Sequence, residues 1–113
     1  DYGRLSVMVQ YRCQPAWLFD VPPQAFSPPP KVTSAIVRLT PYSTLPYPCR
    51  DEKLLGEVVM AAFTMRRKTL RNALGRYPED ILRSTGVNLT SRPETLSVAD
   101  YVAITNALAE ATP

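Results

Sequence analysis

The chain has 113 residues and a formal net charge of +3, with 13 lysines and arginines against 10 acidic residues. This weakly basic balance suits an anionic partner but does not require one. The chain contains no histidine, which excludes histidine-based catalytic triads and histidine metal sites within it. Cys13 and Cys49 lack Cys-x-x-Cys spacing, so we expect no disulfide scaffold, no metal site and a cytoplasmic setting. No apolar run approaches the ~18 residues of a membrane span, and we expect no membrane partner.

The first 48 residues predict one helix and two strands. Residues 3–13 predict an amphipathic helix with Leu5, Met8 and Val9 on its apolar face. Residues 17–21 and 33–40 predict strands. One helix and two strands can bury little apolar surface by themselves. We therefore expect them to be the last elements of a larger sheet. The chain also begins without methionine, inside the predicted helix, and we expect it to be a fragment or a processed piece.

After a proline-rich linker at residues 41–49, the composition changes to helix formers. Asp51 is expected to cap a helix that runs to about Leu74, with Gly75 just beyond its end. The apolar residues of this segment share one broad arc, as expected for a helix with one buried side.

Two shorter helices are expected further along the chain. The first begins near Pro78 and stops at Gly86. The second begins at Ser97, where Asp100 completes a weak capping box. Residues 49–113 therefore predict a small all-α helical bundle.

A basic cluster lies in the predicted long helix. Residues 66–76 carry five cations and no acid. On a continuous helix Arg67 and Arg71 lie side by side, and like charges so placed cost a few tenths of a kcal/mol. We therefore expect an anionic partner, with an ordinary solvated face at a helix C-terminus as the alternative. Arg66 falls within the apolar arc and is expected to be partly buried, whereas Arg92 is either a further phosphate contact or a solubilising loop residue.

Phe26 is surrounded by five prolines, ahead of a β-branched segment. Proline fixes its own φ and restricts the residue before it, so this loop is stiff. A stiffly presented aromatic ring can stack on a nucleobase. The alternative is a proline-rich connector whose phenylalanine fills the core.

Three sequence blocks, in this order, resemble one family. They are Tyr-Gly-Arg-Leu-Ser-Val-Met at 2–8, Ala-Phe-x-Pro-Pro-Pro-Lys-Val-x-Ser-Ala-x-Val-Arg-Leu at 25–39 and Arg-Arg-Lys-Thr-Leu-Arg-Asn at 66–72. The chain resembles the C-terminal portion of a small-subunit ribosomal RNA adenine N6,N6-dimethyltransferase (the KsgA family), and more loosely the erythromycin-resistance methyltransferases. The resemblance implies an α+β fragment. Residues 1–48 would be the last helix and two antiparallel strands of a Rossmann-like methyltransferase sheet, and residues 49–113 an all-α rRNA-binding domain.

The resemblance also implies the chemistry of the parent enzyme. S-adenosyl-L-methionine would supply the methyl groups for two adjacent adenines of small-subunit rRNA in a 30S-type subunit. Phe26 would stack on the target adenine. The residues expected to hold the RNA backbone are Lys31, Arg67, Lys68, Arg71, Arg76 and Arg92.

We expect the chain to be inactive by itself, because it lacks two parts that such an enzyme needs. Its four glycines are never clustered, so we expect no S-adenosyl-L-methionine site and no bound cofactor. Residues 44–47 only superficially resemble the family's catalytic Asn-[Leu/Ile]-Pro-Tyr motif, because Thr44 has no carboxamide. Self-association through exposed strands is expected. Two other functions stay open, a large-subunit rRNA methyltransferase of the erythromycin-resistance type and a stand-alone helical nucleic-acid-binding module.

Overall fold

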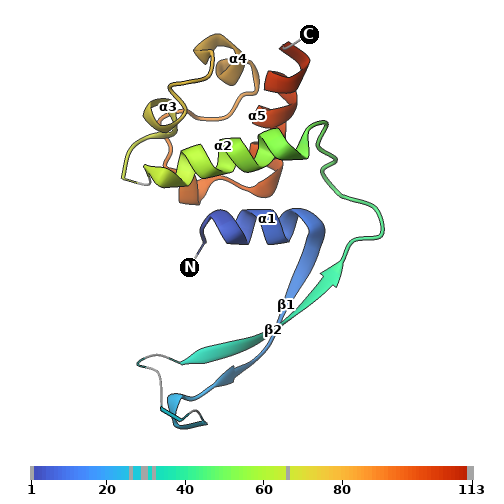
Figure 1. Cartoon of the computed structure of the whole chain (residues 1–113), viewed down its shortest axis with the longest axis vertical. Coiled ribbons are helices and arrows are strands. Elements are labelled where there is room, and N and C mark those ends of the chain that lie inside the picture. The colour runs from blue at the N-terminus through green and yellow to red at the C-terminus, as the bar shows by residue number, and fades with distance from the viewer. Residues whose placement is uncertain (1, 26, 29–30, 32, 66, 112–113) are drawn as a thin grey trace.

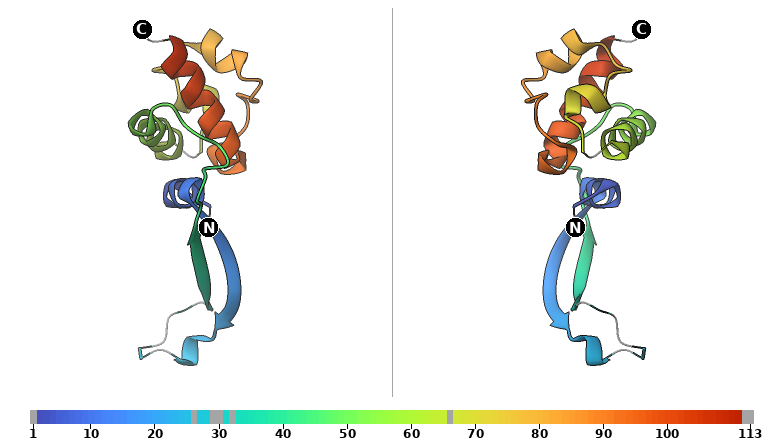
Figure 2. Two further views of the ribbon diagram at one scale, coloured as in Figure 1. Left: turned by 90° about the vertical axis from the view of Figure 1, so that its right-hand side faces the viewer. Right: turned by 90° about the vertical axis from the view of Figure 1, so that its left-hand side faces the viewer.

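The computed structural model describes residues 2–25, 27–28, 31, 33–65 and 67–111. A helical body occupies one end of the longest axis, which measures 53 Å, and a two-stranded ribbon projects from it to the other end (Figures 1 and 2). The elements in chain order are α1 (Arg4–Arg12), β1 (Cys13–Val21), the 3₁₀ turn η1 (Pro23–Ala25), β2 (Ser34–Pro41), α2 (Glu52–Thr64), α3 (Leu70–Ala73), α4 (Glu79–Ser84), the 3₁₀ turn η2 (Pro93–Thr95) and α5 (Val98–Ala111).

Side-chain caps start the two long helices where the sequence predicted them. Asp51 Oδ1 accepts a hydrogen bond of 3.0 Å from the backbone N–H of Leu54 at the start of α2. Ser97 and Asp100 form a reciprocal capping box at α5, since each side chain accepts from the other residue's backbone N–H at 3.1 Å. Both caps satisfy N–H groups that a helix start otherwise leaves without partners.

The core lies between α2 and α5 and is closed by the shorter elements around them. Tyr101 is fully buried, and its hydroxyl donates a 2.7 Å hydrogen bond to the carbonyl of Pro93, which ties η2 to α5. Burial raises the pKa of Tyr101, so this hydroxyl stays protonated and can donate throughout the neutral range. Residues that pack fully or almost fully inside include Leu55, Val58, Val59, Ala62, Leu70, Leu74, Leu82 and Ile104.

Helix α1 packs against α2 and α5 as part of the helical body (Figure 1). Its buried residues are Val7 and Tyr11, one turn apart, whereas Leu5 is 74% exposed. The predicted apolar face was therefore wrong for Leu5, whereas Met8 is partly buried and packs against the core as expected. The face that is buried is set by the position of α2, which the local pattern does not contain.

The hydroxyl of Tyr11 joins three segments at the base of the ribbon. It donates to Glu52 Oε2 at 3.0 Å and accepts from the backbone N–H of Cys49 at 3.2 Å. Burial, reinforced by the hydrogen bond to Glu52, raises the pKa of Tyr11. Arg12 also pairs with Glu52, so one carboxylate at the start of α2 holds the end of α1.

Replacing Tyr11 with Phe should lower the free energy of unfolding by about 1–2 kcal/mol, because it removes one hydrogen bond and leaves the Cys49 N–H without its acceptor. Urea denaturation followed by circular dichroism measures this. Tyr47→Phe is the matched control, because Tyr47 is 48% exposed and should lose almost nothing. Equal losses in the two variants would contradict the role given to the Tyr11 hydroxyl.

The predicted long helix is interrupted. Helix α2 ends at Thr64, and α3 begins only at Leu70. The backbone N–H groups of Leu70 and Arg71 donate to the carbonyls of Ser91 and Leu89, at 2.8 and 2.9 Å. In a continuous helix these N–H groups would bond four residues back. The break is thus a tertiary effect of the loop before η2, and the prediction of a helix to about residue 74 was wrong.

The ribbon is an antiparallel pair in which Cys13 lies opposite Pro41 and Val21 opposite Ser34, with an irregularity between Trp17 and Phe19. Neighbouring residues of a strand lie on opposite faces. Ile36 and Val37 are 42% and 44% exposed, so neither face is covered by other described residues.

The predicted fold class is therefore wrong. We expected the last helix and strands of a Rossmann-like sheet, followed by a separate helical bundle. The described residues instead form one two-stranded antiparallel sheet, and α1 is built into the helical body. Local patterns predicted the strands correctly but not how α1 packs. The proposed domain boundary at residue 48 stays a prediction.

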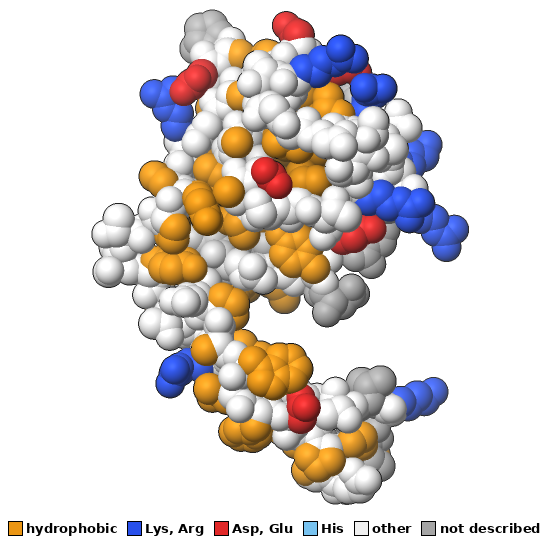
Figure 3. All heavy atoms as spheres, turned by 180° about the vertical axis from the view of Figure 1, so that it is seen from behind, with side chains coloured by type: hydrophobic (Ala, Val, Ile, Leu, Met, Phe, Trp, Pro, Cys, Tyr) orange, Lys and Arg blue, Asp and Glu red, His pale blue; other side chains and the backbone are white. Residues whose placement is uncertain are grey.

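We predict that the chain self-associates through the ribbon. Apolar side chains on uncovered strands favour association, and unpaired strand edges favour added strands. Figure 3 shows this apolar surface, where Trp17 is 68% and Phe19 is 57% exposed. Sedimentation velocity over a range of concentrations should detect oligomers. The cross-strand pair change Trp17→Lys with Val37→Lys should give monomers, and Leu5→Lys should not. A concentration-independent monomer would contradict this prediction.

Candidate nucleic-acid interface

The basic segment begins immediately after α2. The chain turns there, and the N–H of Lys68 donates to the carbonyl of Met65 at 2.8 Å. Arg67 and Lys68 are both exposed on this turn. Arg67 and Arg71 therefore do not share one continuous helix, which corrects the predicted arrangement of these two charges.

The contact between α3 and the 87–92 loop brings a further predicted residue to this region. Leu70 bonds to Ser91, the residue just before Arg92. Arg92 is exposed, and its carbonyl accepts from Thr95 Oγ1 at 2.7 Å. The structure thus places the backbone of Arg92 beside α3, although the two lie about twenty residues apart in the sequence.

Not all of these cations are available to a ligand. Arg71 pairs with Glu79 at 3.3 Å, and Glu79 also pairs with Arg83 at 2.7 Å. One carboxylate therefore offsets part of the positive charge of two arginines. Such exposed ion pairs contribute little to the free energy of unfolding, but they do reduce the local positive charge. The sequence analysis missed this partnership, although the i, i+4 spacing of Glu79 and Arg83 was visible.

The other predicted cations of the helical body have no ion-pair partner among the described residues. Arg67, Lys68 and Arg92 are exposed, and Arg76 lies 5.9 Å from the ring centre of Tyr77. Lysine and arginine side chains gather along one edge of the body, on the right in Figure 3. This edge carries positive charge that the described part of the protein does not neutralise.

The remaining predicted site residues lie elsewhere or outside the described structure. Lys31 is exposed on the connection between β1 and β2, at the far end of the ribbon from the helical body (Figure 2). The chain by itself therefore does not bring Lys31 to the cationic edge. Phe26 and Arg66 lie outside the described residues, so their predicted roles in base stacking and in the apolar arc stay predictions.

The described residues do not fit S-adenosyl-L-methionine. A dinucleotide-type cofactor site needs a glycine-rich turn between a strand and a helix. Here the glycines are isolated, and only Gly86, which ends α4, has a positive φ, of 81°. We therefore derive no chemical step through this cofactor. No cluster of metal-ligating side chains is found in the described part of the chain, and no described helix has the length and apolarity to cross a membrane.

Comparison with known proteins identifies the class of protein to which this chain belongs. A family model described as ribosomal RNA adenine dimethylase matches residues 1–110. The chain belongs to this family of rRNA-modifying methyltransferases.

Among its curated relatives are proteins named ribosomal RNA small subunit methyltransferase A. The one from Acinetobacter baylyi is 53% identical over 107 residues, which is 94% of this chain and 39% of the relative. The one from Citrobacter koseri is 49% identical over 99% of this chain and 41% of the relative. The chain thus spans about two fifths of these proteins. This coverage does not support the predicted assignment to the C-terminal portion of such an enzyme, which we withdraw.

Two solved structures share the fold. The 23S rRNA methyltransferase ErmE gives a TM-score of 0.67 at 24% identity, covering 95% of this chain and 46% of that one. A dimethyladenosine transferase from Plasmodium falciparum gives a TM-score of 0.67 at 21% identity, covering 95% of this chain and 51% of that one. At sequence identities this low, the similarity to these two structures concerns the fold alone.

Proposed function

We propose that this chain supplies rRNA contacts to a small-subunit rRNA adenine N6,N6-dimethyltransferase. The observation that carries the proposal is a set of exposed cations beside α3 that form no ion pair with the described residues, namely Arg67, Lys68 and Arg92. The names of relatives about 50% identical to the chain support a small-subunit rRNA substrate.

The chemistry of this edge suits the backbone of RNA. Phosphates bind to lysine and arginine side chains, and each neutralised phosphate releases counterions, which makes the affinity dependent on salt. Such contacts position a nucleic acid without reading its sequence. The choice of target nucleotide would then depend on other parts of the enzyme, among which we keep Phe26 as the proposed stacking residue for the adenine.

A large-subunit rRNA substrate is the second candidate. The fold likeness to ErmE, a 23S rRNA methyltransferase, favours it. Its 24% identity is well below the 53% to a small-subunit relative, so we prefer the small-subunit substrate. Binding of the chain to isolated small-subunit and large-subunit rRNA hairpins, compared at equal salt, separates the two.

Replacing Arg67, Lys68 and Arg92 together with Ala should weaken binding to an rRNA hairpin. It should also reduce the slope of log K against log salt concentration by about 2–3, since each duplex phosphate contact contributes about 0.9. Fluorescence anisotropy at several salt concentrations measures both quantities.

Two variants control this experiment. Arg50→Ala removes one positive charge at the opposite end of α2, where Arg50 pairs with Glu110 at 3.2 Å, and should leave the slope unchanged. Glu79→Gln releases Arg71 and Arg83 from their shared acid and should strengthen binding. An unchanged slope in the triple variant would mean that its three cations only keep the surface soluble.

We further propose that the chain alone neither binds S-adenosyl-L-methionine nor methylates RNA, because its described residues offer no turn that fits the cofactor. Calorimetric titration should give no heat of specific binding, and methyl transfer to an rRNA hairpin should be undetectable. Binding at micromolar affinity would refute this part of the proposal without affecting the RNA contacts.

A further inference from the structure

Three adjoining hollows follow the exposed face of α2. The first, of about 280 Å³, shares Glu57 and Met60 with the second, of about 200 Å³. The second shares Thr64 and Met65 with the third, of about 350 Å³. Together they form what we call the α2 groove. From Lys53 to Met65 it extends about 18 Å, at 1.5 Å per helical residue.

The floor of the α2 groove is apolar and rich in methionine. Met60, on the side of α2 opposite its buried residues, is 51% exposed, and Met65, which directly follows the last residue of α2, is 43% exposed. Met8 of α1 lines the first hollow. The space beside Gly56 in the first hollow is open, since a Cβ atom added there would meet no atom within 4 Å. Methionine is flexible and its thioether makes favourable contacts with aromatic rings.

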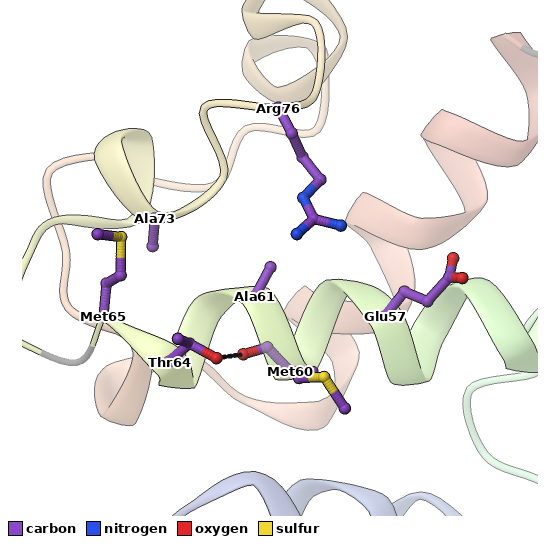
Figure 4. A pocket seen from close by; sticks show the side chains of 7 residues that line it. All are labelled: Glu57, Met60, Ala61, Thr64, Met65, Ala73 and Arg76. Carbon is purple, nitrogen blue, oxygen red and sulfur yellow. Dashed lines mark hydrogen bonds between the residues drawn. The ribbon is translucent and has the colours of Figure 1, made fainter.

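The rim of the α2 groove is cationic along its whole length. Arg4 and Lys53 line the first hollow, and Arg67 and Lys68 line the third. Arg76 points from the segment after α3 toward α2 above the second, while Glu57 projects from α2 along the groove (Figure 4).

Among the described lining residues Glu57 is the single acid, and it makes no ion pair with any of these five cations. Positive charge on the rim therefore exceeds negative charge fivefold. The groove is complementary to an anionic occupant with flat or apolar groups.

We infer that the α2 groove binds unpaired nucleotides of RNA, with bases over Met60 and Met65 and phosphates along the rim. This inference rests on the proposed function, because the third hollow shares Arg67 and Lys68 with the cationic edge. Bases in an RNA duplex are stacked and do not reach such hollows, whereas unpaired bases can be splayed out into them.

An acidic amphipathic helix is the competing occupant. It would need a trough that accepts a cylinder about 10–12 Å wide. The groove is instead divided into hollows of 200–350 Å³, at or below the lower end of the ~300–1,000 Å³ range of small-molecule sites. Each hollow suits one planar group better than a continuous helix face.

The test replaces Met60 and Met65 together with Ala and measures binding to a single-stranded oligoadenylate and to an RNA duplex of equal length. The loss of two contacts between sulfur and aromatic rings predicts about 3- to 150-fold weaker binding of the single strand. Duplex affinity and both salt slopes should be unchanged, since no charge is removed. The Met60→Leu, Met65→Leu variant keeps an apolar floor but has no sulfur, so its affinity for the single strand should lie between those of the original chain and the alanine variant.

The Leu5→Ala variant is the matched control, because Leu5 is 74% exposed and lines none of the three hollows. Thermal unfolding by circular dichroism verifies that each variant folds. Unchanged single-strand binding in the methionine-to-alanine variant overturns the inference, while the salt-slope experiment on Arg67, Lys68 and Arg92 still stands by itself. Absence of all RNA binding overturns both. Methionine-dependent binding of a glutamate-rich amphipathic peptide in place of the oligonucleotide assigns the groove to a protein partner.

Discussion

Two backbone hydrogen bonds, from Leu70 and Arg71 to the loop carbonyls of Ser91 and Leu89, determine the arrangement of the cationic edge of this protein. They begin α3 as a separate helix, so the chain has to turn between α2 and α3. That turn carries Arg67 and Lys68 to the end of α2 and brings Arg76 back over its exposed face. Without the break, the same cations would follow one helix and no hollow would form between α2 and α3.

The electrostatics of the helical body follow from where its few acids lie. Glu79 offsets Arg71 and Arg83, and Glu52 holds Arg12 at the base of the ribbon. Both carboxylates therefore form ion pairs that link neighbouring elements of the fold. The cations left over are concentrated around the end of α2 and along its exposed face. Because these cations are concentrated in one region, a net charge of only +3 still gives a strongly positive local surface.

The ribbon and the helical body differ in how they are stabilised. The body buries a continuous core of aliphatic side chains between α2 and α5. The ribbon has strand-to-strand hydrogen bonds but exposes apolar side chains on both faces, so it gains little from burial. Its attachment to the body depends on α1, through the burial of Val7 and Tyr11 and the hydrogen bonds of the Tyr11 hydroxyl.

Features that depend on local chemistry could be predicted from the sequence. The caps at Asp51 and Ser97, the end of α4 at Gly86 and the second strand appear where local preferences predicted them. The first strand was also predicted, but it begins at Cys13, four residues before the expected start. The three sequence blocks also indicated the family correctly. The clustering of cations at residues 66–76 is also a property of the chain itself, although their arrangement around α3 is not.

The buried faces of the helices, and the charges that form no ion pair among the described residues, follow from how the elements pack together. The buried face of α1, the end of α2 at Thr64 and the neutralisation of Arg71 each depend on residues that are distant in the sequence or on a different element. The α2 groove could not be predicted either, because its walls come from α1, α2 and the segment after α3, which are distant from one another in the sequence. The spacing of apolar residues in the sequence indicates that a helix has an apolar side. How much of that side is exposed to water depends on which other elements pack against the helix.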